Sequence, residues 1–338
     1  MMYDWLILAG GLVLLIVGGE LLVRGAVAIA EKLGMSPLLI GLTLVGFGTA
    51  TPELVTSVKA AMVNAPGIAI GNIVGSNTAN ILLILGISAL LAPITVASIA
   101  LKRDGAIMLV ATILFSLVSY FYTLDRIVGV AFIALLIGYI LFAYFQERRS
   151  TAAGHALASA AGARTEAIDE LHKKAGTPSD PEAAMGHMGV NTVVAVLMAL
   201  AGLVLVIFGA EFLVDGATAI ARVAGMSETV IGLTVVAIGT SMPEFVASLV
   251  AALRGHNDVA LGNVIGSNIY SILGIGGGTA LINPTNVPPE IVTFDNPVMI
   301  GASVVLLIFA ATGLRLGRIE GLIMLVGYAA YIYLLIPK

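Results

Sequence analysis

The sequence lacks cysteine and is poor in charge. None of its 338 residues is a cysteine, which excludes disulfide bonds, thiolate metal sites and cysteine nucleophiles. Only 11% of the residues are charged, against about 25% in soluble domains, whereas 59% are hydrophobic. Such a chain has too little charge to cover a soluble surface. We therefore expect an integral membrane protein with the lipid bilayer around it and no soluble catalytic domain.

Apolar segments long enough to cross a bilayer core, which takes about 20 residues, recur along the whole chain. Hydropathy and turn residues predict ten spans: 5–30, 37–63, 67–91, 104–123, 127–145, 189–221, 228–254, 258–282, 296–314 and 317–336. The segment 146–188 between the fifth and sixth spans is rich in Ala, Gly, Ser and charge, which is typical of a linker. The predicted organisation is thus a five-helix unit over 1–145, a linker over 146–188 and a second unit over 189–338.

The two predicted units repeat one another. A shift of 191 residues places GGELLVRGA (18–26) on GAEFLVDGA (209–217), GLTLVGFGTATPE (41–53) on GLTVVAIGTSMPE (232–244), and GNIVGSN (71–77) on GNVIGSN (262–268). Because each unit has an odd number of spans, the second enters the membrane from the opposite side. The expected fold is an all-α polytopic membrane protein of ten transmembrane helices in two inverted repeats, the architecture of many secondary transporters.

Basic residues indicate the orientation. With the N-terminus outside, the outer side receives only Lys59, Arg126, Arg222 and Lys338. The cytoplasmic side receives Lys32, Lys102, Arg103, Arg148, Arg149, Arg164, Lys173, Lys174, Arg254, Arg315 and Arg318. This bias follows the positive-inside rule. We expect a protein of the cell (plasma or inner) membrane with an external N-terminus and a cytoplasmic linker.

A carboxylate lies within each of two repeat-related apolar segments. Glu53 belongs to the second predicted span and Glu244 to the seventh. A charge at the bilayer centre costs at least about 2.5–3.5 kcal/mol, so such residues are rare and usually functional. We therefore predict that Glu53 and Glu244 form the centre of the functional site.

A proline precedes each of these glutamates. Pro52 offers no N–H to the carbonyl of Gly48, and Pro243 likewise offers none to that of Gly239. We expect both helices to kink here and to present unsatisfied carbonyl oxygens beside the carboxylates.

Polar side chains recur every four residues in four predicted spans, so that each set shares a helix face. The four sets are Thr49, Glu53 and Ser57; Asn72, Ser76 and Asn80; Thr240, Glu244 and Ser248; and Asn263, Ser267 and Ser271. In inverted repeats these faces can meet at one cavity. Every donor is an oxygen, and Ca2+ takes about 6–8 oxygens in flexible geometry. Two glutamates also supply the −2 charge that one Ca2+ neutralises.

Exchange follows from the same charges, because a site with both glutamates bare would carry uncompensated charge through a low dielectric. Ca2+ and monovalent ions then compete for overlapping ligands. A cation channel is the main alternative, since the same oxygens could line a pore. An intramembrane hydrolase is a further alternative, but no nucleophile–base pair or metal-binding histidines accompany the carboxylates. The sequence gives no signal for a cofactor, a nucleic-acid partner or a protein partner.

At these motifs the chain resembles the Ca2+/cation antiporter superfamily and, within it, the prokaryotic sodium/calcium exchangers. The matching segments are GTATPE with GNIVGSNTAN in the first unit and GTSMPE with GNVIGSNIYS in the second. The resemblance implies that Glu53 and Glu244 bind Ca2+ with help from Thr49 and Thr240. It also implies that Ser76, Asn80 and Ser267 take part in the ion cluster.

Two positions depart from the family pattern. Ser271 stands where many sodium-coupled members carry an aspartate, and Ala50 lacks the hydroxyl that Ser241 supplies in the second unit. Hydroxyl and amide oxygens can ligate Na+ but are poor proton acceptors, which favours Na+ as the coupling ion. Proton coupling stays open, because the buried glutamates can carry protons themselves. The complete predicted ion-binding set is Glu53, Glu244, Thr49, Thr240, Ser76, Asn80, Ser241, Ser267 and Ser271.

Overall fold

The computed structural model describes residues 2–33, 35–96, 100–146, 191–223 and 237–335. Within these ranges, eight helices are long and apolar enough to cross a membrane: Tyr3–Leu33, Pro66–Leu91, Leu101–Phe121, Arg126–Gln146, Thr192–Ile220, Asn257–Ile282, Ile291–Ala311 and Arg318–Leu335. A ninth candidate is a bent pair, Pro37–Thr49 and Thr51–Met62. These helices agree with the predicted spans to within about five residues at each end, apart from the span predicted over 228–254.

That span lies partly outside the described residues. Its described part consists of α11 (Ala237–Thr240) and α12 (Met242–Leu253). Nearly all of the predicted linker over 146–188 also lies outside them. The structure thus describes a helical protein with eight spans, or nine if the bent pair is one span.

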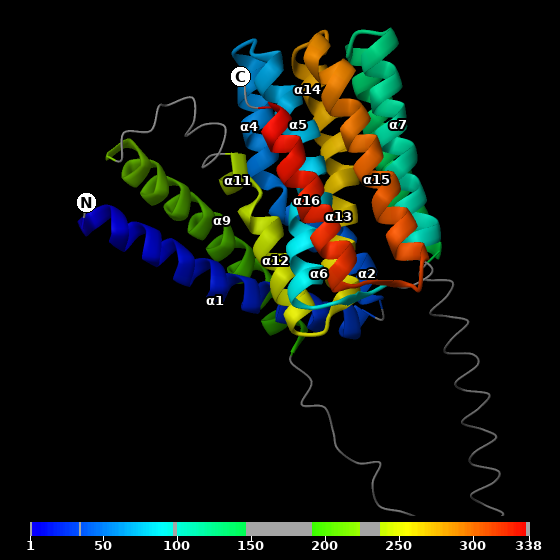
Figure 1. The fold of residues 1–338 in the computed structure, drawn as a ribbon. Coiled ribbons are helices and arrows are strands. Elements are labelled where there is room, and N and C mark those ends of the chain that lie inside the picture. The colour runs from blue at the N-terminus through cyan, green and yellow to red at the C-terminus, as the bar shows by residue number, and fades with distance from the viewer. Residues whose placement is uncertain (1, 34, 97–99, 147–190, 224–236, 336–338) are drawn as a thin grey trace, which may run out of the picture.

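The two longest helices, α1 (Met2–Leu33) and α9 (Thr192–Val223), lie side by side and oblique to the other helices (Figure 1). Each has 32 residues and is therefore about 48 Å long, well beyond the bilayer core of about 30 Å, which a steep tilt accommodates. Their backbones come close at glycines. A Cβ added to Gly18 would lie 2.8 Å from the Val206 nitrogen, and one added to Gly209 would lie 2.8 Å from the Leu15 nitrogen. Larger side chains at these positions would force the two helices apart.

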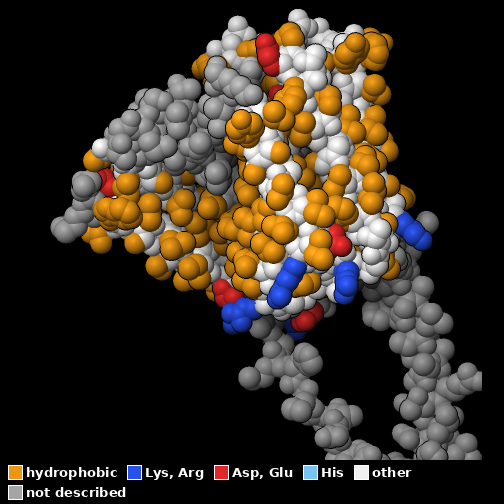
Figure 2. All heavy atoms as spheres, in the orientation of Figure 1, with side chains coloured by type: hydrophobic (Ala, Val, Ile, Leu, Met, Phe, Trp, Pro, Cys, Tyr) orange, Lys and Arg blue, Asp and Glu red, His pale blue; other side chains and the backbone are white. Residues whose placement is uncertain are grey.

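The remaining helices run roughly parallel to one another as a bundle beside this pair (Figure 1). Its interior is a cluster of buried aliphatic and aromatic side chains that includes Ile73, Ile81, Phe115 and Met299. Hydrophobic side chains also cover the outer surface, with Tyr3, Ile127 and Ile319 each more than 70% exposed. Figure 2 shows this apolar covering on the visible face. A surface of this kind belongs in lipid, so the chain is an integral membrane protein.

The helices break or widen at positions next to the predicted site. Ala50 separates α3 (Gly46–Thr49) from α4 (Thr51–Met62), and the two parts of this span meet at 45°, as the proline predicts. Several other spans contain π-helical turns, and two of these turns hold predicted site residues: η2 (Asn80–Leu85) and η5 (Tyr270–Ile275). The first begins at Asn80 and the second contains Ser271. Such turns place side chains out of the regular helical register and often mark functional sites.

The remaining elements complete these spans. They are α2 (Pro37–Ile40), η1 (Gly41–Val45), α5 (Pro66–Ala79), α6 (Gly86–Leu91), η3 (Ala100–Gly105), α7 (Ala106–Phe121), α13 (Asn257–Ile269), α14 (Gly276–Ile282), η6 (Ile291–Asp295), α15 (Asn296–Ala311) and α16 (Arg318–Leu335).

Short backbone pairings tie the loops at both ends of the bundle. At one end β1 (Ile94–Thr95) pairs antiparallel with β2 (Arg315–Leu316). At the other end Leu124 and Thr285 form an isolated antiparallel bridge. A shift of 191 residues converts Ile94 into Thr285 and Leu124 into Arg315. Equivalent pairings of the two sequence halves therefore lie at opposite ends of the bundle, as in an inverted pair of units.

Candidate ion-binding site

The two predicted carboxylates are buried inside the bundle. Glu53 lies in the first turn of α4 and is 2% exposed, and Glu244 lies in the first turn of α12 and is fully buried. Their charges interact electrostatically. Both glutamates follow a proline in a helix that begins inside the protein, so they sit near the positive end of a helix dipole. That placement stabilises negative charge where the side chains are shielded from water.

The hydrogen bonds of the two carboxylates differ. Ser241 donates to Glu53 Oε1 at 3.1 Å, across the two halves of the sequence. The equivalent residue of the first half is Ala50, which has no hydroxyl to offer Glu244. Within the described residues neither oxygen of Glu244 meets the geometry of a hydrogen bond, and the Thr49 hydroxyl donates to Asn263 Oδ1 at 3.2 Å.

An asparagine holds the helix of each carboxylate. Asn72 Nδ2 donates to the Glu53 carbonyl at 3.1 Å and to Ser57 Oγ at 2.9 Å. Asn263 Nδ2 makes the matching bonds to the Glu244 carbonyl at 3.1 Å and to Ser248 Oγ at 2.8 Å. These amides fix α5 against α4 and α13 against α12. The sequence placed both asparagines on the polar stripes but did not show that they clamp the carboxylate helices.

The remaining predicted residues pair across the two halves of the sequence. Ser76 Oγ lies 3.4 Å from Ser271 Oγ, and Asn80 Nδ2 donates to Asn268 Oδ1 at 3.0 Å. Ser267 Oγ donates to the Gly46 carbonyl at 3.1 Å.

Eight of the nine predicted ion-binding residues are buried, and the ninth, Thr240, is partly buried beside the break before α12. Asn268, next to Ser267 in the sequence, also lies within this network through its bond to Asn80.

One carbonyl expected to be unsatisfied is bonded. The Thr51 hydroxyl donates to the Gly48 carbonyl at 2.8 Å and takes the place of the N–H that Pro52 lacks. The Gly46 carbonyl instead links the two halves, because it accepts a hydrogen bond from the Ser267 hydroxyl. The kink was therefore predicted correctly, but the prediction of a free Gly48 carbonyl was wrong.

Charge pairs outside the site are satisfied locally. Glu20 pairs with Arg24, one helical turn later, and also with Arg254 at 2.9 Å. Arg103, placed above on the cytoplasmic side, is 8% exposed in η3 and binds Asp104 through Nε at 2.7 Å. This bond allows the guanidinium to be buried at the end of its span.

An aspartate–tyrosine pair near one end of each half was missed. Tyr139 donates to Asp104 at 3.0 Å, and Tyr331 donates to Asp295 at 2.8 Å. The signal was an aspartate at the same repeat position in both halves, followed by a tyrosine 35 or 36 residues later.

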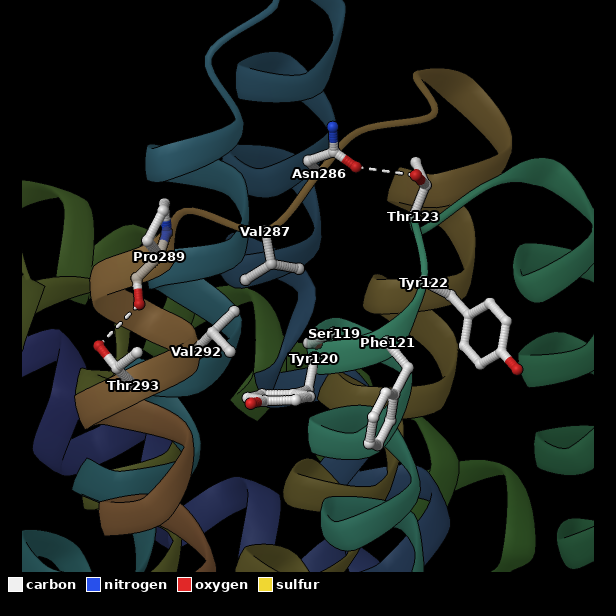
Figure 3. Close-up of a pocket in the computed structure, with 10 residues that line it drawn as sticks. All are labelled: Ser119, Tyr120, Phe121, Tyr122, Thr123, Asn286, Val287, Pro289, Val292 and Thr293. Carbon is white, nitrogen blue, oxygen red and sulfur yellow. Dashed lines mark hydrogen bonds between the residues drawn. The ribbon is translucent and has the colours of Figure 1, made fainter.

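A surface pocket of about 400 Å³ lies away from the carboxylates, where α7 ends and η6 begins (Figure 3). Tyr120, Val287 and Val292 line it, and a hydrogen bond from Thr123 to Asn286 spans its rim. Its described lining contains no acidic residue. This pocket is therefore unsuited to a cation, in contrast to the enclosed carboxylate pair.

Several buried oxygens of the site lack a hydrogen-bond donor within the described residues: Glu53 Oε2, Glu244 Oε1 and Oε2, Asn77 Oδ1 and Asn80 Oδ1. Buried acceptors without a partner are costly, and carboxylates most of all. A hard cation satisfies such oxygens, and an oxygen-only set matches Ca2+ or Na+ better than a soft metal.

Buried carboxylates at broken helices inside a membrane bundle define the class of polytopic membrane transport proteins. The chain belongs to the sodium/calcium exchanger protein family, whose model matches residues 3–145 and 194–336. It is 38% identical to the putative antiporter CaxA of Alkalimonas amylolytica, over 96% of each chain. It is 37% identical to the sodium/calcium exchanger MaX1 of Methanosarcina acetivorans, over 98% of each chain. Membership of this family makes the chain a transporter and not an enzyme.

The fold also matches a solved structure. The sodium-calcium exchanger NCX_Mj superimposes with a TM-score of 0.81 at 31% identity, over the full length of both chains. The match covers both halves of this chain, including α1, α9 and the carboxylate helices.

Proposed function

We propose that this protein exchanges Ca2+ for Na+ by alternating access at a site between Glu53 and Glu244. The observation that carries the proposal is a pair of buried carboxylates, from equivalent positions in the two halves, with oxygens that lack donors. The relatives named as a sodium/calcium exchanger and a sodium-calcium exchanger, which match along nearly the whole chain, support it.

Ca2+ is the substrate that fits this chemistry best. Two carboxylates balance its charge, and hydroxyl and amide oxygens from Thr49, Ser241 and Asn80 extend the ligand set. Mg2+ would require a stricter octahedron of ligands. Ca2+ and its counter-ion are cargo, and the proposal includes no resident cofactor.

Exchange by alternating access fits the burial of the site better than conduction does. Both carboxylates are buried, whereas carboxylates that line an open aqueous pore would be exposed to water. A site with two bare charges is also costly to reorient through the membrane interior. Ion loading on either side therefore permits switching, and the two kinds of ion alternate.

Na+ is the proposed coupling ion because neutral oxygens surround the carboxylates. Ser76, Ser267 and Ser271 offer hydroxyl groups that coordinate Na+ but do not accept protons at physiological pH. Proton coupling is the second candidate, because Glu53 and Glu244 are desolvated and close enough for their charges to interact.

Proteoliposomes loaded with radioactive Ca2+ test the coupling ion. We expect efflux when external Na+ is added at clamped pH, and none when external acid is added without Na+. Efflux that is driven by acid and does not depend on Na+ would show that the protein exchanges Ca2+ for protons and not for Na+. Flux that needs no counter-ion and does not saturate would indicate a channel.

The membrane arrangement that we propose has ten spans in two inverted five-helix units, 1–145 and 189–338, joined by the linker 146–188. The end pairings Ile94–Leu316 and Leu124–Thr285 support the inversion. Lys and Arg side chains gather at the end of the bundle where α16 begins, which supports a cytoplasmic assignment of that end (Figure 2).

Introduced cysteines test this orientation in a chain that has none. Val63 is 75% exposed just after α4, at the proposed outer end. An impermeant thiol reagent applied to intact cells should label Val63→Cys and leave Ala160→Cys, in the linker, unlabelled. The cysteine-free parent is the background control, and the reverse pattern would invert the topology.

A further inference from the structure

An ion pair joins α1, one of the two oblique helices in Figure 1, to the bundle. Arg254, at the end of α12, binds both carboxylate oxygens of Glu20 in α1, through Nε at 2.9 Å and through Nη2 at 2.9 Å. Glu20 also pairs with Arg24 of its own helix. The bond to Arg254 therefore links two helices, whereas the bond to Arg24 stays within α1.

The helices are closely packed beside this ion pair. A Cβ added to Gly19 would lie 2.6 Å from Val246 Cγ1 and 3.2 Å from Val250 Cγ2, both on α12. Val246 also packs against the cluster that Leu15 of α1 forms with Ala210 of α9. One face of α12 is therefore covered by the helix pair α1 and α9, with the ion pair at the end of this contact.

The sequence repeat gives α4 an equivalent face, which is exposed. A shift of 191 residues relates Val246 to Val55 and Arg254 to Val63. Val55 is 44% exposed and Val63 is 75% exposed. The helix pair thus covers α12 and leaves the matching face of α4 open. In inverted-repeat transporters one part of the protein rocks against the other, so the counterpart conformation has α9 packed on α4.

The counterpart conformation has no equivalent ion pair. The repeat partner of Glu20 is Glu211 on α9, which supplies the carboxylate. The repeat partner of Arg254 is Val63, which supplies no positive charge. The ion pair therefore stabilises one of the two conformations and not the other.

We propose that the bond between Glu20 and Arg254 is a latch, which holds the conformation described here and must open before α1 and α9 can pack on α4. The proposal rests on alternating access, as in the proposed function. Both side chains are partly exposed, 24% for Glu20 and 54% for Arg254, and exposed ion pairs are weak. We therefore expect the latch to change the ratio of the two conformations about two- to fivefold. An effect of this size favours one conformation without stopping transport.

Double electron–electron resonance in proteoliposomes tests the latch, with spin labels on Phe208→Cys of α9 and Met62→Cys of α4. These positions are 50% and 72% exposed, and the chain has no other cysteine to label. We expect a longer distance in the conformation described here and a shorter one in its counterpart. Arg254→Gln should shift the ratio about two- to fivefold toward the shorter distance.

The partner residue and a matched control complete this measurement. Glu20→Gln should give the same shift as Arg254→Gln, and the double variant should shift no further, because all three lack the same bond. Arg24→Gln removes a charge beside the same carboxylate but keeps the link to α12, so its ratio should be unchanged. An equal shift in Arg24→Gln would show that only the local charge matters and would refute the latch.

Moving the arginine to the other half gives an independent test. Val63→Arg places a positive charge on α4 where Glu211 can reach it in the counterpart conformation, so the shorter distance should gain population. Combined with Arg254→Gln, the gain should be larger. If neither variant changes the ratio while Ca2+ exchange continues, the latch is refuted and the proposed function stands. Absence of Na+-driven Ca2+ exchange in the unaltered chain would instead refute the proposed function.

Discussion

The two halves of the site are alike in backbone and unlike in the hydrogen bonds of their carboxylates. Asn72 and Asn263 clamp the two glutamate helices through nearly identical bonds. Yet Glu53 receives the Ser241 hydroxyl, and Glu244 has no donor within the described residues. The matching asparagine bonds hold the two glutamate helices in equivalent positions. The difference between the carboxylates therefore comes from the side chain that reaches each of them from the other half. A single missing oxygen at Ala50 is enough to make the carboxylates inequivalent.

Removing either carboxylate charge should have the largest effect, because it leaves one half of the site without its charge. In Glu53→Gln or Glu244→Gln, the one remaining charge cannot balance Ca2+, so a bound Ca2+ would leave an uncompensated positive charge in a low-dielectric interior. We expect Ca2+ transport in proteoliposomes to fall at least ~100-fold. Glu31→Gln, at the exposed end of α1, is the matched control and should transport normally. Normal exchange by either site variant, in protein that is monodisperse in detergent, would show that the ions bind elsewhere.

Moving the hydroxyl of Ser241 to the equivalent position 50 tests whether this one group causes the difference between the two carboxylates. Ser241→Ala leaves both carboxylates without that donor and removes a proposed ligand, and a hydrogen bond to a charged group is worth about 1.5–3 kcal/mol. The Ca2+ concentration for half-maximal transport should rise about 10-fold or more. Adding Ala50→Ser in the same chain should restore most of the affinity by giving Glu244 the equivalent donor.

Ser303→Ala is the control for the loss of a buried hydroxyl, because within the described residues Ser303 donates to the Met299 carbonyl of its own helix and to no other helix. Its Ca2+ dependence should be unchanged. If the Ala50→Ser, Ser241→Ala double variant is no better than Ser241→Ala, the two positions are not interchangeable and the hydroxyl acts only through Glu53.

Removing either asparagine clamp should have the smallest effect, a loss of stability that differs in size between the two variants. Hydrogen bonds between membrane helices average about 0.6 kcal/mol, so Asn72→Ala, which loses two, should lower the free energy of unfolding by about 1 kcal/mol. Asn263→Ala should cost more, because it also removes the bond that the Thr49 hydroxyl donates to Asn263 Oδ1. Thermal unfolding in detergent, followed by size exclusion, measures both. Equal losses would mean that the bond between Thr49 and Asn263 contributes nothing to stability.

Most of the helices could be predicted from sequence because the signal is local. Long apolar runs identified the spans, and the proline at 52 identified the break that the structure shows as a 45° bend. The π-helical turns at η2 and η5 were not predicted, since they depend on how neighbouring helices pack and carry no composition signal. The burial of Arg103 was missed for a related reason. Hydropathy counts a guanidinium as exposed unless its partner is known, and here the partner is the adjacent Asp104.

The sequence by itself determined the membrane class, the repeat of 191 residues, and which polar side chains share a helix face, because these follow from composition and the helical period. Only the tertiary structure decided which faces meet. Ser241 reaches Glu53 across 188 positions, Ser267 reaches Gly46 across 221, and Ser76 meets Ser271 across 195. A helical period fixes the angle between side chains on one helix, but it leaves free the rotation and sliding of one helix against another. Packing at the close backbone contacts and the asparagine clamps restricts both, and so selects the partners of each carboxylate.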